Sequence, residues 1–305
     1  MAYKVVISGG SGLVGTRLTE LLQQLGYQVA HLSRSQKEND SVLYYLWDVE
    51  AGQIEPGALD NATAVINLAG AGVADHRWTP TYKQKIINSR VAGTELLVRE
   101  MANMKQKPDV FVSASAIGYY GNNAGDKYRI EEAEPGSDFL AQVCQAWEAA
   151  ALPAQAEHGI RTVIPRIGIV LTPRGGVLKE MHLPFRLGLG APLGSGDQIM
   201  SWIHLDDLCY AIIMMMQEEH FQGVYNAVAP QPVTNKAFSV QLAEVMHKPF
   251  FAPNIPSFAI KTALGQQRAG IALGGQKASA AKLQEAGYVF RYPHLTPALH
   301  NLLKT

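Results

Sequence analysis

The chain has 305 residues, 47% of them hydrophobic, which is enough to bury a large core in one domain or in a main domain with a smaller lobe. Lysine plus arginine and aspartate plus glutamate both number 26, and no basic run stands out, so we do not expect a nucleic acid as the main partner. No apolar stretch reaches the roughly 18 residues of a membrane span, so we expect no membrane partner either.

The start of the chain and its cysteines bear on where the protein works. A core strand is predicted from residue 4 onward, so we expect no signal peptide before it. The two cysteines, Cys144 and Cys209, lie far apart and lack metal-ligand spacing, so we expect no metal site. Two isolated thiols are typical of a reducing compartment, and the sequence predicts a cytoplasmic protein.

The predicted strand over residues 4–7 runs into a glycine-rich turn. Gly9 allows the backbone to turn, Gly12 allows a pyrophosphate to approach, and Gly15 allows helix and strand to pack closely. The helix that follows offers free N–H groups and the positive end of its dipole to an anion. A tight turn without a ligand is the alternative, but a place at the start of a βαβ unit favours dinucleotide binding. The predicted cofactor contacts in this turn are Gly9, Gly10, Ser11, Gly12, Leu13, Val14 and Gly15.

The end of the second strand, expected over residues 28–34, indicates which dinucleotide is bound. An acidic residue at this point would bond the ribose 2′-hydroxyl of NAD and repel a 2′-phosphate. The chain has Ser33 and Arg34 there instead, followed by Ser35. A solvated loop arginine is the alternative interpretation, but the position and the missing acid predict NADP(H) as the cofactor.

The third and fourth strands, expected over residues 42–47 and 65–68, add further predicted cofactor contacts. Asp48 is placed to accept a bond from an adenine amino group, although an aspartate that starts a turn explains it equally well. The small residues after the fourth strand let the backbone lie against the ribose and phosphates of the cofactor. The contacts predicted there are Leu68, Ala69 and Gly70.

A long helix is predicted to begin at Pro80, with Thr79 as its N-cap. Arg90 shares the inward stripe of this helix with apolar residues, so it either pairs with an anion, such as the cofactor, or reaches to the edge. Arg77 and Trp78 precede the helix, at the carboxyl end of the sheet where ligands bind, and are predicted substrate contacts.

The fifth strand, expected over residues 110–115, completes a pattern that resembles a known superfamily. The glycine turn, Leu68-Ala69-Gly70, Val91-Ala92-Gly93-Thr94 and the serine-rich strand ending in Tyr120-Gly121 resemble the extended short-chain dehydrogenase/reductases. Within them, the chain is most similar to epimerase-family proteins of unassigned substrate that carry an extra C-terminal segment. The supporting motifs are Arg77-Trp78, Ser89-Arg90-Val91, Ser201-Trp202-Ile203-His204-Leu205-Asp206-Asp207 and Phe290-Arg291-Tyr292-Pro293.

The resemblance implies a catalytic serine and a Tyr-x-x-x-Lys pair on the next helix, in which the tyrosine moves a proton to or from the substrate oxygen. Ser115 matches the serine by position. The expected helix over residues 139–148 contains neither tyrosine nor lysine, so the pair is missing. Tyr119 is the predicted substitute, against the alternative of a ring packed under its loop.

Three further residues are candidate substitutes for the missing pair. Cys144 is more typical of a small buried hydrophobe, and Glu148 of a charge on the helix surface. His204 is a third candidate, although Asp206 or Asp207 as a helix cap explains that stretch without catalysis.

The rest of the chain is predicted to form two more strands of the sheet and a substrate lobe. A sixth strand over residues 161–171 contains Pro165, which indicates a bulge or an edge position, and a seventh covers 223–227. We expect a dinucleotide-binding domain over residues 1–171 and about 201–229, and a lobe over 172–200 and 230–305. The remaining predicted substrate contacts are Met181, Phe185 and Trp202.

Together these patterns predict an α/β protein of the Rossmann type, with a doubly wound parallel sheet and a small, mostly helical C-terminal lobe. The function predicted first is an NADP(H)-dependent oxidoreductase or epimerase acting on a small polar, nucleotide-sugar-like molecule. An NADP(H)-binding sensor without turnover is the alternative, favoured by the missing tyrosine and lysine. A Rossmann-like methyltransferase fits the motifs less well. The sequence leaves monomer and homodimer both open.

Overall fold

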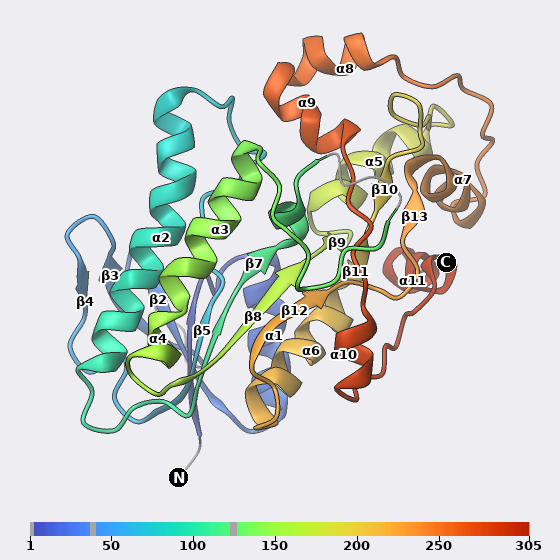
Figure 1. Ribbon diagram of the computed structural model, residues 1–305. Helices are drawn as coiled ribbons and strands as arrows, with labels where there is room; N and C mark the ends of the chain where they lie inside the picture. Colours follow the sequence, from blue (N-terminus) through green and yellow to red (C-terminus); the bar gives the residue numbers. More distant parts are fainter. Residues whose placement is uncertain (1–2, 37–40, 123–126, 305) are drawn as a thin grey trace.

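The computed structural model describes residues 3–36, 41–122 and 127–304. Within these residues the chain forms a nine-stranded sheet in the order β12-β8-β6-β5-β1-β2-β3-β4, with β7 also pairing β8 (Figure 1). All strand pairs in this sheet are parallel except the short β3–β4 pair. The strand order reverses beside β1, because β2 lies on one side of it and β5 on the other. A doubly wound Rossmann-type sheet, as predicted, is therefore confirmed.

The strands of the main sheet are β1 Lys4–Ser8, β2 Gln28–Ser33, β3 Leu43–Asp48, β4 Gln53–Ile54, β5 Ala62–Asn67, β6 Val110–Ser113, β7 Ser115–Ala116, β8 Arg161–Ile167 and β12 Gly223–Ala227. Four further short strands are β9 Ile169–Leu171, β10 Ile199–Met200, β11 Trp202–His204 and β13 Val233–Thr234. The helices are α1 Leu13–Gln24, α2 Pro80–Ala102, η1 Ile117–Tyr120 (a 3-10 turn), α3 Phe139–Ala151, α4 Pro153–Ala156, α5 Gly176–Arg186, α6 Leu205–Gln217, α7 Asn235–Val245, α8 Ser257–Leu264, α9 Gln266–Leu273, α10 Ala281–Glu285 and α11 Leu295–Leu303.

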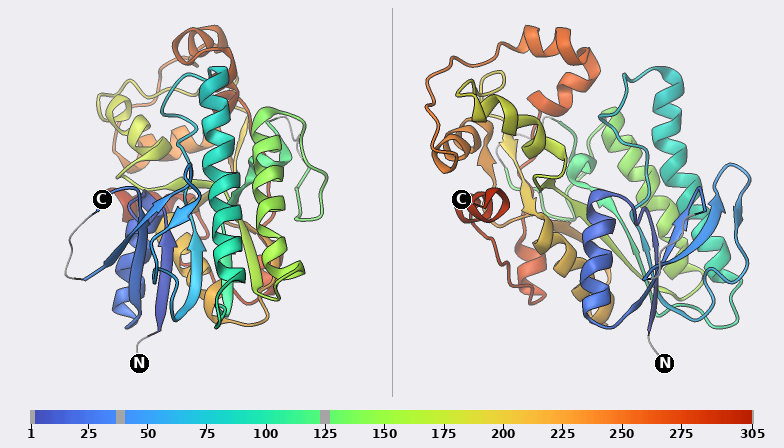
Figure 2. Two further views of the ribbon diagram at one scale, coloured as in Figure 1. Left: turned by 90° about the vertical axis from the view of Figure 1, so that its left-hand side faces the viewer. Right: turned by 180° about the vertical axis from the view of Figure 1, so that it is seen from behind.

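Helices cover both faces of the sheet, as a parallel sheet buried on both sides requires (Figures 1 and 2). Helices α1 and α6 pack on one face, over a core that includes Val5 and Ile7 of β1. Helices α2 and α4 cover the other face, where Val6 of the same strand is buried. Alternate residues of β1 therefore serve opposite cores, and all five of its residues are buried.

Local signals place the second long helix as expected. Thr79 accepts a hydrogen bond from the backbone N–H of Tyr82, and Pro80 occupies the first turn of α2. A proline is tolerated at this position because its missing N–H would have no partner inside the helix. No helix of the described residues has both the length and the apolar character to cross a membrane.

The expectation for Pro165 is corrected by the structure. The sixth strand breaks at Gly168 into β8 and β9, and Pro165 lies inside β8, which has neighbours on both sides. The register runs without a bulge from Val112 opposite Val163 to Ser115 opposite Arg166. The proline therefore faces the short interruption between β6 and β7, where a missing N–H donor breaks the pairing.

A third core lies in the C-terminal part of the chain, among α5, α7, α11 and the strands β9, β10 and β11. The largest fully buried side chain in this core is Trp202, followed by Phe238. Most of its residues belong to the segments assigned to the lobe from the sequence. The exact domain boundaries stay a prediction.

Candidate functional site

The glycine turn joins β1 to α1 at the reversal of strand order, on the side where the parallel strands end. Gly9 has a φ of +76°, and a Cβ there would lie 2.8 Å from the carbonyl carbon and oxygen of Leu68. A Cβ on Gly15 would lie 2.4 Å from the oxygen of Gly9. The predicted tasks of Gly9 in turning the chain and of Gly15 in close packing are thus confirmed.

Gly10 has a different task, which the sequence did not reveal. A Cβ on Gly10 would lie 2.4 Å from the imidazole ring of His31, which is buried at the centre of β2. The ring Nε2 of His31 also hydrogen-bonds Thr19 Oγ1 of α1 at 2.7 Å. Gly10 therefore makes room for a side chain that links β2 to α1.

The N-terminus of α1 has the features of an anion site. Gly12 precedes the helix, no side chain caps it, and no acidic residue lies in its first turn. Ser11, Gly12 and Leu13 are exposed, and a Cβ on Gly12 would meet only the Gly9 oxygen, at 3.2 Å. Free backbone N–H groups and an open approach fit the pyrophosphate of a dinucleotide.

The end of β2 carries no carboxylate. Ser33 and the backbone of Ser35 exchange two hydrogen bonds, of 2.8 and 3.3 Å, in a local turn. This turn leaves Arg34 exposed. A guanidinium on this exposed turn fits a 2′-phosphate, and its role stays a prediction.

Two other predicted cofactor contacts make bonds within the chain. Asp48 Oδ1 accepts hydrogen bonds from the N–H groups of Glu50 and Ala51, at 2.9 and 3.0 Å. These are the bonds of an aspartate that starts a turn, which was the alternative to an adenine contact. Arg90 Nη1 donates to the carbonyl oxygens of Ala71 and Ile86, at 3.0 and 3.1 Å.

Arg90 braces the loop that follows β5. A Cβ on Gly70 would lie 2.8 Å from the Arg90 guanidinium carbon, which also lies 5.0 Å from the ring centre of Trp147. Burial lowers the pKa of Arg90, and no carboxylate of the described residues lies within ion-pair distance of it. The guanidinium therefore lies against Gly70 without a carboxylate partner among the described residues.

Ser115 donates its hydroxyl proton to Glu148 Oε1 at 2.6 Å. The same carboxylate accepts two hydrogen bonds from Arg166, from Nε to Oε1 and from Nη2 to Oε2, both at 2.8 Å. The side chains of Arg166 and Glu148 are only 3% and 9% exposed. The sequence interpretation of Glu148 as a surface charge is therefore wrong, because its partner comes from β8, eighteen residues further along the chain.

The Arg166 guanidinium is also the meeting point of two tyrosines. Its carbon lies 3.4 Å from the ring centre of Tyr119, which covers it as a packed ring. Its Nη1 donates to Tyr120 Oη at 3.0 Å, and Tyr120 donates to Asn226 Oδ1 at 2.7 Å. Burial raises the pKa of Tyr120 to about 12. Sequence reasoning missed Tyr120, Arg166 and Asn226.

The acid end of this network is Glu131. Its Oε1 accepts from the Asn226 N–H at 2.6 Å, while its backbone oxygen accepts from Arg166 Nη1 at 2.8 Å. Burial raises the pKa of the Glu131 carboxyl. We call the set Ser115, Glu148, Arg166, Tyr120, Asn226 and Glu131 the Ser115 network.

The other two candidates for proton transfer have structural places. Cys144 is buried, and burial raises its pKa to about 11, so it is a small core side chain rather than a thiolate. His204 is itself the cap of α6, because its Nδ1 accepts from the N–H of Asp206. The expected caps, Asp206 and Asp207, instead bind Arg17 and the backbone of Arg291 and Tyr292.

The predicted substrate contacts divide into two groups. Arg77 is exposed, and Trp78 is half-buried with its Nε1 donating to Val73 O and its ring edge-on to Phe139. Both remain available at the carboxyl edge of the sheet. Arg268 of α9 bonds the Ala74 oxygen in the same loop, so the C-terminal segment reaches this edge.

The second group lies in the core of the lobe. Trp202 is fully buried and donates to Gln231 O, and Phe185 is 3% exposed and stacked on Phe250. Met181 packs half-buried against the same core. Trp202 and Phe185 therefore lie in the packed core of the lobe in this structure.

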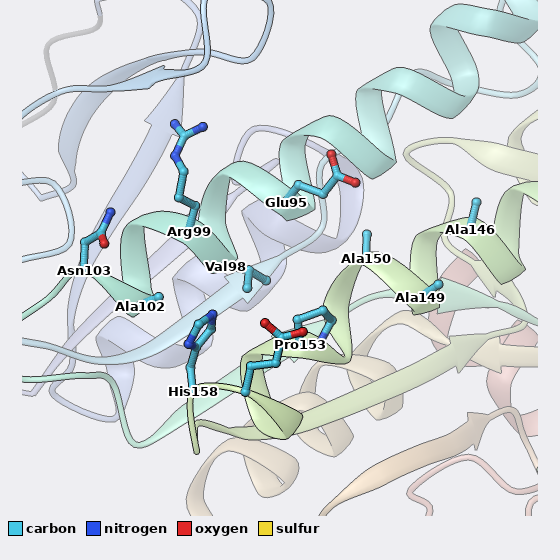
Figure 3. Close-up of a pocket in the computed structure, with 11 residues that line it drawn as sticks. Glu95, Val98, Arg99, Ala102, Asn103, Ala146, Ala149, Ala150, Pro153 and His158 are labelled. Carbon is cyan, nitrogen blue, oxygen red and sulfur yellow. The ribbon is translucent and has the colours of Figure 1, made fainter.

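A surface hollow of about 660 Å³ lies elsewhere, on the outer side of α2, α3 and α4 (Figure 3). Its lining includes four alanines of α2 and α3 together with Glu95, Arg99 and His158. None of its residues belongs to the glycine turn, the end of β2 or the Ser115 network. Among the described residues, no group of His, Cys, Asp or Glu is arranged to hold a metal ion.

The doubly wound sheet and the glycine turn at its reversal define a Rossmann protein of the extended short-chain dehydrogenase/reductase class. Residues 5–227 match the family described as NAD dependent epimerase/dehydratase, and 255–302 match a domain of unknown function, DUF1731. The chain belongs to this epimerase/dehydratase family and carries the extra C-terminal domain, which confirms the predicted resemblance.

Relatives match along nearly the whole chain. An epimerase family protein of Mycobacterium bovis is 38% identical over 296 residues, covering 97% of this chain and 96% of its own. The crystal structure of the human epimerase family protein SDR39U1 with NADPH has a TM-score of 0.89 and 33% identity, covering 99% of both chains. The structure of MoeE5 with UDP-glucuronic acid and NAD, at 19% identity and a TM-score of 0.79, shares the fold, covering 99% of this chain and 98% of its own.

Proposed function

We propose that the protein is an NADP(H)-dependent oxidoreductase or epimerase that acts on a small polar, nucleotide-sugar-like molecule. The observation that carries the proposal is the pairing of an open, uncapped helix N-terminus at Gly12 with an exposed arginine, Arg34, where an acid would select NAD. The crystal structure of the human relative with NADPH supports the choice of the phosphorylated nucleotide. Two buried free cysteines support a reducing compartment such as the cytoplasm.

The residues divide the binding of such a nucleotide among them. The N–H groups at the start of α1 would hold the pyrophosphate, and Arg34 with Ser33 would hold the 2′-phosphate. The loop Leu68 to Gly70, with the Arg90 charge behind it, would lie against the ribose. A bound nicotinamide nucleotide supplies or accepts a hydride, and the chain itself must then place the substrate and move a proton.

The cofactor assignment is tested by titrating NADPH and NADH into the wild-type protein and Arg34→Ala. We expect the variant to bind NADPH more weakly by about 1.5–3 kcal/mol, the value of a charged hydrogen bond, with little change for NADH. Arg99→Ala, which removes an exposed arginine on α2, is the matched control and should change neither affinity. Equal losses for both nucleotides in Arg34→Ala would reject the assignment.

Turnover is tested by screening carbonyl compounds and nucleotide sugars with NADPH and NADP⁺. A second candidate function, an NADP(H) sensor, is favoured by one observation, namely that α3 contains neither tyrosine nor lysine. Net oxidation of NADPH, net reduction of NADP⁺ or epimerisation of any member of the screen supports the enzyme. Tight NADPH binding with no turnover across the screen supports the sensor.

A further inference from the structure

Helix α3 lacks the usual acid–base pair but contributes a buried carboxylate to the carboxyl edge of the sheet. Glu148 lies one turn after Cys144 on the inner face of α3, and only 8% of its surface is exposed. Two elements meet it there, because Ser115 comes from β7 and Arg166 from the neighbouring strand β8. A hydroxyl, a carboxylate and a guanidinium are thus joined by bonds of 2.6 to 2.8 Å.

We propose that Glu148 is the proton acceptor behind Ser115 and that Arg166 orients it, so that these three residues replace the missing tyrosine and lysine. Ser115 is the group that would touch the substrate oxygen, and Glu148 and Arg166 act through it as positioning residues. The proposal deepens the proposed function and rests on it.

The direction of the Ser115 hydrogen bond decides what Ser115 offers to a substrate. A serine hydroxyl has one proton and two acceptor lone pairs. The proton is given to Glu148 Oε1, so only the lone pairs remain for a second partner. Ser115 is therefore set to accept a proton from a substrate hydroxyl.

Arg166 fixes the carboxylate in the form that this task needs. Its bidentate contact satisfies both oxygens of Glu148 and stabilises the charged form. Burial acts against the charge on Arg166, but the hydrogen bonds to Glu148 outweigh it and raise the pKa of the guanidinium. Arg166 thus stays charged and holds Glu148 as a base.

The proton transfers between the substrate, Ser115 and Glu148 balance in both directions of the reaction. When a substrate alcohol is oxidised, its hydroxyl proton passes to Ser115 Oγ as the serine proton passes to Glu148 Oε1. The C–H bond at the same carbon would break and a carbonyl would form, and bound NADP⁺, the oxidant named in the proposed function, would take the hydride. In the reduction the protons run back along the same bonds, from a protonated Glu148 through Ser115 to the new alcohol.

Stability alone does not account for this arrangement. A buried ion pair contributes little net stability compared with apolar side chains of similar volume, because both charges lose their water. The Ser115 network nevertheless satisfies the pair on every side, through Tyr120 and the Glu131 backbone. Such satisfaction fixes the geometry of Glu148 toward Ser115.

The first test uses the compound that gives the fastest turnover in the screen and follows kcat against pH. We expect Ser115→Ala and Glu148→Gln to lower kcat by about 100-fold or more, the usual contribution of a general base. The pH profile of kcat should differ between the wild-type protein and Glu148→Gln, because the variant lacks the carboxylate behind Ser115. NADPH affinity should stay unchanged in both variants.

Controls separate the relay from a structural effect. Glu95→Gln changes an exposed carboxylate of α2 that lies outside the Ser115 network, and it should keep kcat within about threefold. Glu148→Asp keeps a carboxylate and should recover part of the rate that Glu148→Gln loses. If Glu148→Gln does not fold, Ser115→Ala decides, since it leaves the ion pair in place. A normal kcat and pH profile in Ser115→Ala or in folded Glu148→Gln would overturn the relay.

A second readout needs no substrate. A buried hydroxyl that donates to a carboxylate at 2.6 Å should give a downfield, slowly exchanging proton resonance in the NMR spectrum. We expect it in the wild-type protein and Glu95→Gln, and not in Ser115→Ala or Glu148→Gln. Its absence from the wild-type spectrum overturns the relay. Failure of every compound in the screen, by contrast, counts against the proposed function.

Discussion

The glycine turn and the Ser115 network lie at the same edge of the sheet, yet they differ in how they are built. The turn offers backbone groups to a ligand, and Ser11, Gly12 and Leu13 are exposed. Its geometry requires glycines, because a Cβ at Gly9 or Gly15 would clash with neighbouring backbone. The network consists of side chains with little exposed surface, and its geometry depends on charges that neutralise one another. The turn therefore keeps the glycine spacing of its family. The proton-transfer site beside it can instead be built from different residues.

This difference explains why the protein is recognisable as a nucleotide-binding protein while its reaction is not. A phosphate site made of N–H groups tolerates only residues without side chains at fixed spacing. A proton-transfer site can be rebuilt from any hydroxyl, acid and base that the fold brings together. Three substitutions probe the two regions and the C-terminal segment.

The largest effect is expected where a charge is buried. Arg166→Met leaves the Glu148 carboxylate without its cation, which should lower the free energy of unfolding by about 3–5 kcal/mol in urea titrations. Arg99→Met is the control, because Arg99 is 54% exposed in its pair with Glu100 and should cost less than about 1 kcal/mol. Similar losses in the two variants would mean that the network does not hold the sheet edge together.

An intermediate effect is expected in the turn. Gly15→Ala places a Cβ 2.4 Å from the Gly9 oxygen, so it should cost about 1–3 kcal/mol and abolish NADPH binding, as melting and fluorescence titration would show. Gly12→Ala meets only the Gly9 oxygen, at 3.2 Å, and should destabilise the fold less. A greater loss of stability in Gly12→Ala would contradict the assigned tasks.

The smallest effect concerns the anchoring of the C-terminal segment, where His204 bonds Asn301 and stacks on Tyr292. Burial lowers the pKa of His204 from its ordinary 6.5, despite the nearby Asp206 carboxylate. The unfolded chain then takes up this proton first, so stability should decline as the pH falls below about 6.5 toward the lower folded pKa. His204→Asn keeps a capping side chain and should flatten this decline, measured by urea unfolding at several pH values. An unaltered slope would assign the decline to other groups.

The sequence predicted those parts of the fold that depend on short-range signals. Thr79 and Pro80 mark the start of α2 within two residues, and the glycines mark the turn within seven. It did not predict the short strand β4 or the interior place of Pro165, because both depend on which strands become neighbours. The burial of Glu148 was missed for the same reason, since an acid on a helix looks solvent-exposed until its arginine on another strand is known.

Gly10 and His31 have a consequence for how this protein can vary over time. The imidazole occupies the space where a Cβ of residue 10 would lie, so the two positions share one volume. A homologue with alanine at the first position should therefore carry a smaller side chain at the second, and the two exchanges should appear together in its ancestry. Exchange of Gly10 for alanine before His31 changes would pass through a crowded intermediate, whereas shrinking the side chain at residue 31 first leaves room for the later exchange.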